Sequence, residues 1–182
     1  MAIPAGRYEL GPENGTLSVR TGRTGAAAKA GHNLLIDVTV WQATLEIGED
    51  PAQTSIALTA DAASLRVREG TGGMQALGDD DKASIEQTID DEVLLRQPIE
   101  FRSTSVRTSA DGRRLHVQGE LTLVGTTGPI AFDVEVGDGG ALSGGAVVTQ
   151  AGWGIAPYSA LFGTLKVTDE VEVALAAVLP PG

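Results

Sequence analysis

The sequence predicts an all-β fold: an antiparallel β-barrel of about eight strands, with one short helix before the central hairpin. Two observations support it. Apolar and polar residues alternate through most of the chain, and 24 of the 182 residues are glycines without a regular repeat, which indicates many tight turns. Strands with one apolar face are typical of antiparallel sheets, and closure into a barrel removes their exposed edges.

The central hairpin lies within residues 98–136, where the alternation is strongest. Residues 125–129, which are rich in glycine and threonine, are predicted to form the turn between its two strands. Apolar residues recur at every second or fourth position before this run and at every second position after it: Leu115, Val117, Leu121, Leu123, Ile130, Phe132, Val134 and Val136. Each strand therefore has one apolar face.

Further strands are predicted on both sides of the hairpin from the same alternation. They cover residues 8–10, 17–19, 32–40, 41–47, 56–60, 65–67, 146–150 and 167–175. The small-residue run 25–30 has no clear period. It is either a strand packed closely under a neighbour or a connector, since propensity alone does not separate the two.

One helix is predicted from residue 79 onward, because Ile85, Ile89 and Val93 have the spacing i, i+4, i+8. Residues 79–81 at its start are all aspartates. Carboxylates there cap free N–H groups and meet the positive end of the helix dipole. Capping is favoured over a metal site, since three adjacent aspartates cannot all reach one ion. We expect the apolar stripe to seal one end of the barrel or to lie on its wall.

The composition restricts the partners and the chemistry. The length fits a single barrel domain over residues 1–182. A formal net charge of −11 argues against a nucleic-acid partner and against stable docking on anionic membranes, so a bound lipid is expected inside the protein. The absence of cysteine excludes disulfides, thiolate metal sites and cysteine nucleophiles.

The location of the protein is predicted from the beginning of the chain and from its hydropathy. The first ten residues lack the basic and apolar regions of a signal peptide, and no window approaches 18 apolar residues. These features favour a cytoplasmic protein without stable membrane insertion. A chain from which a leader had been removed would look the same.

Few residues are suited to catalysis. His32 and His116 are the only histidines, and His116 shares a strand face with polar Gln118 and Glu120, so it is expected to face solvent. His32 begins a strand, where we expect it to cap the barrel mouth or to bond a backbone carbonyl. There is no Gly-x-Ser-x-Gly elbow and no phosphate-binding glycine loop. The sequence therefore predicts no enzyme activity, no cofactor and no metal; catalysis on a captured ligand through His32 is a weaker alternative.

The hairpin also contains residues that match two sequence motifs of a known protein family. One set of residues resembles the family segment Y-P-x-I-x-F-x-S: Pro98, Ile99, Phe101, Ser103 and Thr104. A second set resembles its glycine, threonine and proline pattern: Gly119, Leu121, Gly125, Thr127, Pro129 and Val134. With these motifs, and with weaker similarity at residues 6–10 and 162–171, the chain resembles the YceI-like family.

The resemblance implies a lipocalin-like barrel that binds polyisoprenoids and related amphiphiles, with a helix before Pro98. Dimers are common in the family, so a homodimer is allowed for this chain. The chain departs from the family after the first strand, where it has Gly11, Pro12, Glu13 and Asn14 instead of a D-P-x-H-S-type stretch. It therefore looks like a divergent branch of the family.

These observations together predict a non-catalytic carrier that holds a long apolar chain inside the barrel, such as a polyisoprenoid or an isoprenoid quinone. The expected ligand-binding residues on the inner wall are Leu34, Ile36, Leu58, Ile99, Phe101, Leu121, Phe132, Val173 and Leu175. Those expected at the mouth are Trp153, Tyr158 and Phe162. The alternative is a barrel filled by its own side chains that acts through protein–protein contacts, since a packed wall and a ligand-binding wall alternate in the same way.

Overall fold

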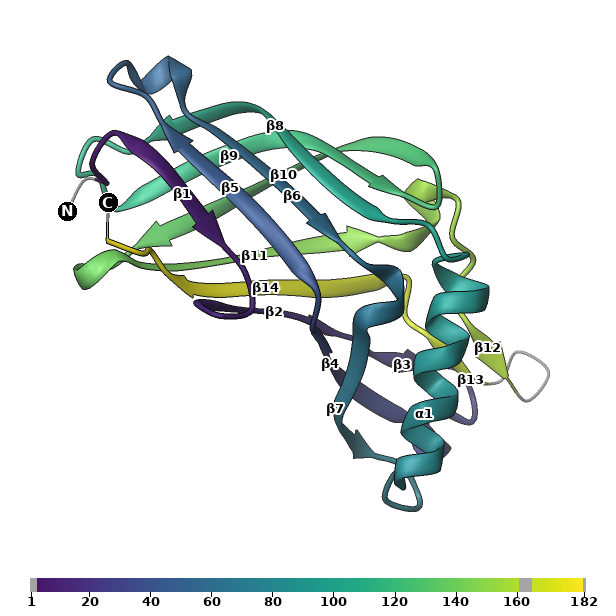
Figure 1. The fold of residues 1–182 in the computed structure, drawn as a ribbon. Coiled ribbons are helices and arrows are strands. Elements are labelled where there is room, and N and C mark those ends of the chain that lie inside the picture. The colour runs from purple at the N-terminus through teal and green to yellow at the C-terminus, as the bar shows by residue number, and fades with distance from the viewer. Residues whose placement is uncertain (1–2, 161–164, 182) are drawn as a thin grey trace.

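The computed structural model describes residues 3–160 and 165–181, and most of its regular structure is antiparallel β-sheet (Figure 1). The large sheet has eleven strands: β1 (Gly6–Leu10), β2 (Gly15–Arg20), β4 (His32–Val38), β5 (Trp41–Ile47), β6 (Ser55–Ala60), β7 (Leu65–Gly72), β8 (Ile99–Thr108), β9 (Arg114–Leu123), β10 (Thr126–Val136), β11 (Ala141–Thr149) and β14 (Glu170–Val178). The small sheet has three: β3 (Arg23–Thr24), β12 (Ser159–Ala160) and β13 (Leu165–Val167).

Helical structure is sparse among the described residues. The helix α1 (Asp79–Thr88) continues into a π-helical turn, η4 (Ile89–Val93). Short 3₁₀ turns connect strands elsewhere: η1 (Ala28–Ala30), η2 (Pro51–Gln53), η3 (Ala62–Ser64), η5 (Asp138–Gly140) and η6 (Gln150–Trp153). The predicted helix before the central hairpin is thus confirmed.

The large sheet has the strand order β1-β5-β6-β8-β9-β10-β11-β14-β2-β4-β7, and neighbouring strands are antiparallel. It curls strongly, so that one face is turned inward (Figure 1). The predicted antiparallel all-β class is confirmed. The strand number is larger than the predicted eight.

The bent strands form one continuous ribbon. β4 leads into β5 and β6 leads into β7, and the two pairings follow each other in register: Val38 lies opposite Leu65, and Trp41 lies opposite Ala60. One half of the ribbon pairs with β1 and β8, and the other half pairs with β2. The ribbon therefore connects the two ends of the curled sheet through its own backbone.

A corner in this ribbon is stabilised by hydrogen bonds between its two strands. The Asp61 N–H donates to the Val40 carbonyl at 3.0 Å, and the Thr39 N–H donates to the Ser64 carbonyl at 2.9 Å. The hydroxyl of Ser64, which is buried, donates to the Asp61 carbonyl at 2.7 Å, and the Asp61 carboxylate accepts from the Ala63 N–H at 2.9 Å. Side chains and backbone thus satisfy the polar groups that the bend removes from the regular ladder.

The turn of the central hairpin is tighter than predicted. Val124 and Gly125 form it, with φ angles of 46° and 75°, and residues 126–129 belong to β10 rather than to the turn. Positive φ at both central residues is typical of two-residue hairpins, because it matches the right-handed twist of the strands. The prediction that residues 125–129 form the turn was therefore wrong in extent, since their glycine and threonine content reflects packing as well as turn formation.

A seam separates β10 from β11 over much of their length. The two strands pair only between residues 133–136 and 142–145. Pro129 lies in the part of β10 that pairs with β9 alone. A residue without an N–H is tolerated there, because β10 has no partner strand on its other side.

Residues 25–30 form a connector. A bend follows β3, and the 3₁₀ turn η1 then leads to β4. Of the two interpretations that the sequence left open, the packed strand is wrong.

Helix α1 lies against β7, the edge strand of the large sheet (Figure 1). The Glu86 carboxylate accepts a hydrogen bond from the Val67 N–H of β7 at 2.9 Å. At the start of the helix, the Asp81 carboxylate accepts from the Gly78 N–H at 3.0 Å, which confirms the predicted capping role for this aspartate. The helix therefore covers the edge and satisfies one of its free donors.

We expect the substitution Glu86→Ala to release α1 from the edge strand. The substitution leaves the Val67 N–H without its charged acceptor, a bond worth about 1.5 kcal/mol, so hydrogen exchange in α1 and at Val67 should become roughly tenfold faster. Glu92→Ala is the control, since it removes an exposed carboxylate from the helical turn that follows α1. Equal exchange in the two variants would show that the Glu86 bond does not hold the helix.

Candidate functional site

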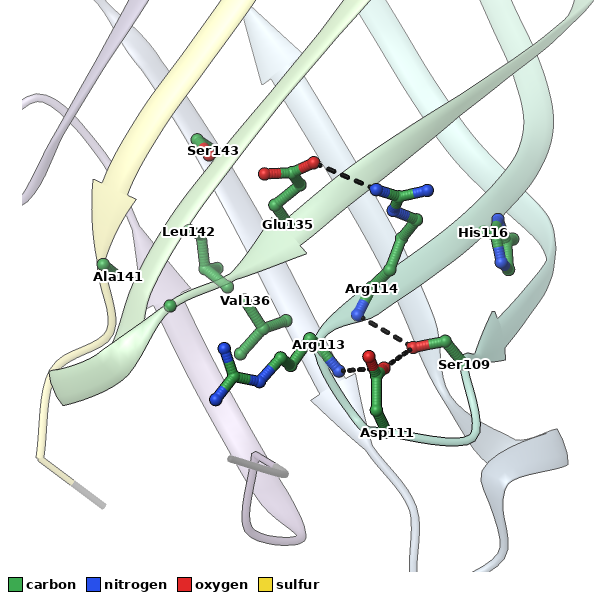
Figure 2. A pocket seen from close by; sticks show the side chains of 11 residues that line it. Ser109, Asp111, Arg113, Arg114, His116, Glu135, Val136, Ala141, Leu142 and Ser143 are labelled. Atoms are coloured by element: carbon green, nitrogen blue, oxygen red, sulfur yellow. Dashed lines mark hydrogen bonds and ion pairs between the residues drawn. The ribbon is translucent and has the colours of Figure 1, made fainter.

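One hollow lies on the outer face of the sheet, beside the turn between β8 and β9 (Figure 2). Its polar groups bond to one another: Arg114 pairs with Glu135 at 3.2 Å, and the Asp111 carboxylate accepts from the Ser109 hydroxyl and from the Arg113 N–H. The Ser109 hydroxyl, and then the Arg113 amide, lower the pKa of Asp111 below its ordinary value. Such exposed pairs hold a turn and contribute little else.

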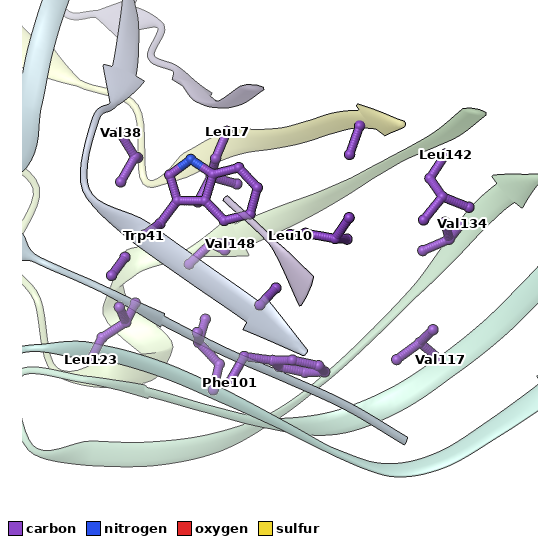
Figure 3. Packing of buried hydrophobic residues seen from close by; sticks show 14 of the residues in the cluster. Leu10, Leu17, Val38, Trp41, Phe101, Val117, Leu123, Val134, Leu142 and Val148 are labelled. Atoms are coloured by element: carbon purple, nitrogen blue, oxygen red, sulfur yellow. The ribbon is translucent and has the colours of Figure 1, made fainter. Parts of the chain in front are cut away.

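The second hollow is a cavity of about 630 Å³ on the inner face of the curled sheet. Its lining is almost entirely aliphatic and aromatic, and it comes from most strands of the large sheet and from α1. Figure 3 shows side chains from several strands, among them Leu17, Phe101, Leu123 and Val148, directed into the enclosed space. Apolar cavities of a few hundred cubic ångströms with few polar groups are the usual form of a small-molecule site.

Side chains fill the end of the barrel near the β8–β9 turn. Tyr8, Val106, Val117 and Val136 are buried there without lining the cavity. The Tyr8 hydroxyl donates to the Pro4 carbonyl at 2.8 Å. The interior thus combines a packed end with an unfilled remainder.

Most of the predicted ligand-binding residues lie on the cavity wall. Leu34, Ile36, Leu58, Ile99, Phe101, Leu121, Phe132, Tyr158, Val173 and Leu175 all line it. Period-two alternation predicted all of these except Tyr158, because the structure turns the apolar face of each strand inward. Tyr158 was predicted at the mouth as an aromatic residue with a polar tip.

Two aromatic rings shape the middle of the cavity. The ring centroids of Phe101 and Phe132 are 5.3 Å apart, with the planes tilted by 55°. Phe101 extends across Gly119 on β9, where an added Cβ would lie 2.6 Å from the Phe101 Cζ and closer still to the Arg102 carbonyl. Glycine at position 119 therefore makes room for an inward-facing phenylalanine on the neighbouring strand.

Trp153 is not on the cavity wall, contrary to the prediction. It is buried, its indole N–H donates to the Leu121 carbonyl at 2.7 Å, and its ring packs over Gly128 of β10. It therefore helps to fill the seam where β10 and β11 lose their pairing. The predicted residue Phe162 lies outside the described residues.

The cavity reaches the surface near β3 and β13. Tyr158 and Lys166 line it and are also exposed to solvent, and Arg23 and His32 line it as well. We call these four residues the cavity mouth. The strand pairing of β13 with β3, where Lys166 lies opposite Thr24, brings them together from distant parts of the chain.

His32 bonds a backbone carbonyl, one of the two roles predicted for it. One ring nitrogen, Nε2, lies 2.6 Å from the Gln75 carbonyl oxygen, so it donates to that oxygen. The ring packs closely over Gly73, whose φ is 74° and where no side chain would fit. His116 is exposed as predicted, with its Nδ1 2.7 Å from the Asp133 carboxylate on the outer face.

Several lining residues were not predicted as ligand contacts. The helical stripe Ile85, Ile89 and Val93 lies on the cavity wall, one of the two places expected for it. Strand residues were missed too, among them Val19, Ile56, Leu123, Ile130 and Val134. Each occupies an inward-facing position of its strand, so the alternation alone would have been enough to predict it.

No cluster of three or more metal-ligating side chains of the His, Cys, Asp or Glu type occurs among the described residues. In the same part of the chain, no helix has the length and apolar character needed to cross a membrane.

The cavity lining supplies apolar surface and a few hydrogen-bonding groups. This arrangement is suited to holding an apolar molecule.

Comparison with known proteins gives a family match. The model of the YceI-like domain matches residues 8–179. No curated protein matches the sequence.

Solved structures with a similar fold cover most of the chain. BcnA from Burkholderia cenocepacia has a TM-score of 0.64 and 16% identity, and the match covers 90% of this chain and 95% of BcnA. The YCEI protein of Campylobacter jejuni has a TM-score of 0.58 and 12% identity, covering 81% of this chain and 85% of that protein. A polyisoprenoid binding domain from Saccharophagus degradans, implicated in plant cell wall breakdown, has a TM-score of 0.55 and 10% identity, covering 97% of this chain and 100% of the domain. At these identities the likeness shows the fold.

We expect Trp153→Phe to destabilise the protein more than Trp41→Phe does. Both tryptophans are buried, at 7% and 5% exposure, but only Trp153 has an indole hydrogen bond among the described residues. The difference should be about 1 kcal/mol in the free energy of unfolding, measured by urea titration. Equal losses would show that the Leu121 bond contributes nothing to stability.

The substitution Gly119→Ala tests the packing of Phe101. The added methyl group meets both the ring and a backbone carbonyl, so we expect a loss of about 1–3 kcal/mol of unfolding free energy. Gly152→Ala is the control, because a Cβ there meets no atom within 4 Å. If the two variants are equally stable, residue 119 does not need to be glycine.

Proposed function

Since the chain belongs to the YceI-like family, we propose that it binds a long-chain apolar amphiphile, of the polyisoprenoid or isoprenoid-quinone type, inside its barrel. The observation that carries this proposal is the apolar cavity of about 630 Å³. The similar fold of the polyisoprenoid binding domain from Saccharophagus degradans supports the choice of ligand class.

The size of the cavity fits such a chain. A cavity of roughly 150 Å³ accommodates one benzene molecule, so this one has room for on the order of 20 to 25 carbon atoms. Burial of each CH₂ group contributes roughly 0.8 kcal/mol, and about ten of them offset much of the cost of immobilising the ligand. Affinity can therefore come from the chain alone.

The proposed role is non-catalytic: the protein carries the ligand or shields it from water. The described lining residues include a single histidine, whose Nε2 is bonded to the Gln75 carbonyl, and no carboxylate. Acid–base catalysis on a bound molecule needs a titratable group directed at it, usually supported by a second group. A carrier needs neither the titratable group nor the group that supports it.

The experiment is native mass spectrometry of freshly purified protein, followed by organic extraction and identification of the released lipid. Val173→Trp, on the cavity wall, is compared with Val178→Trp, an exposed position on the same strand β14. We expect the wild type and Val178→Trp to retain a bound mass of several hundred daltons, and Val173→Trp to lose most of it because the indole fills the cavity. Circular dichroism checks that each variant is folded.

Two results would contradict the proposal. One is a folded Val173→Trp variant that retains as much lipid as the wild type, since the ligand would then lie elsewhere. The other is a wild-type protein that is empty and fails to take up added isoprenoid quinone or fatty acid.

A further inference from the structure

The charge on the cavity wall is opposite in sign to that of the whole protein. The chain has 24 acidic and 13 basic residues, Lys and Arg, yet the described lining contains Arg23 and Lys166 and no Asp or Glu. Acidic residues are therefore absent from the one surface where a ligand is expected.

Two segments of the chain produce this distribution. Residues 14–36 contain Arg20, Arg23 and Lys29 without an acidic residue, and residues 139–168 contain Lys166 without one. The pairing of β3 with β13 brings the two segments together at the cavity mouth. Figure 1 shows β3 and β13 at the same end of the molecule as α1.

Within residues 3–160 and 165–181, neither Arg23 nor Lys166 forms an ion pair with a carboxylate. The ion pairs among the described residues lie elsewhere: Arg7 with Glu9 and Glu46, Arg68 with Asp37, Arg96 with Asp91, Arg114 with Glu135, and His116 with Asp133. Arg23 donates from one nitrogen to the neutral Thr71 carbonyl at 2.9 Å. Because a guanidinium has five N–H donors, Arg23 retains others for a ligand.

The cavity therefore has two chemically different parts: a long apolar wall and a cationic mouth. An amphiphile with an anionic oxygen head group matches both, because a cationic site binds such a group through charge-assisted hydrogen bonds. We propose that the ligand carries a phosphate or carboxylate head group, which binds Arg23 and Lys166 at the mouth with Tyr158 beside it. This proposal rests on the proposed function and adds the class of head group.

The test compares ligands that share a chain and differ in the head group. Binding of geranylgeranyl phosphate and geranylgeraniol to the whole protein is measured by calorimetry, together with palmitate and hexadecanol. We expect the anion to bind at least tenfold more tightly than the alcohol in one or both pairs, and the advantage to shrink as salt is added. The pair with the larger ratio identifies phosphate or carboxylate as the preferred head group.

Variants locate the head-group site. Lys166→Gln and Arg23→Gln should each reduce the ratio of anion to alcohol affinity at least threefold. Arg23→Lys keeps the positive charge, so it should retain most of the ratio of anion to alcohol affinity. This variant therefore separates the effect of losing the charge from the effect of losing the hydrogen bond to the Thr71 carbonyl. Arg107→Gln is the matched control, an exposed arginine away from the cavity.

The outcomes separate the two proposals. Equal binding of anion and alcohol by the wild type would overturn the anionic head group and leave the apolar-chain proposal intact. A preference for the anion that persists in the Arg23→Gln, Lys166→Gln double variant would overturn its placement at the mouth. Failure to bind any of the four ligands would count against the proposed function itself.

Discussion

The structure depends on one constraint: a long antiparallel sheet with one apolar face has to turn that face away from water along its whole length. The bent ribbon of β4–β5 and β6–β7 provides the solution, because its two halves pair with strands at opposite ends of the sheet. The bend removes backbone groups from the regular ladder, and Ser64 and Asp61 satisfy them. At the edge strand β7, helix α1 covers the backbone, and Glu86 accepts a hydrogen bond from one of its free N–H groups.

The interior remains partly empty because of the sizes of the side chains on its wall. Only 4% of the chain is aromatic, and Trp41 and Trp153 are used at the corner and at the seam. Across the rest of the wall the side chains are mostly aliphatic, and Phe101 and Phe132 are the only phenylalanines among the lining residues described. A sheet of this curvature lined mainly by Leu, Ile and Val leaves a space that the side chains do not fill.

Local pattern in the sequence was enough to predict the sheet, the helix before the hairpin and nine residues of the cavity wall: period-two alternation predicted the strands and their inward faces, and the spacing i, i+4, i+8 predicted the helix. It failed where distant packing decides the outcome. Trp153 was expected at the mouth because aromatics favour such places, but Gly128 on another strand provides the surface on which it packs. The breaks at residues 39–40 and 61–64, by contrast, lie where alternation had already separated residues 32–40 from 41–47 and residues 56–60 from 65–67.

The seam between β10 and β11 makes the mechanical properties of the wall uneven. Where neighbouring strands are paired along their whole length, as β9 and β10 are, widening the sheet means breaking several ladder hydrogen bonds at once. Along residues 126–132 of β10 the described residues show no ladder to β11, and the indole of Trp153 bonds across to Leu121 instead. The curled sheet is therefore anisotropic in its compliance: it resists widening where neighbouring strands are fully paired and yields more easily along the seam.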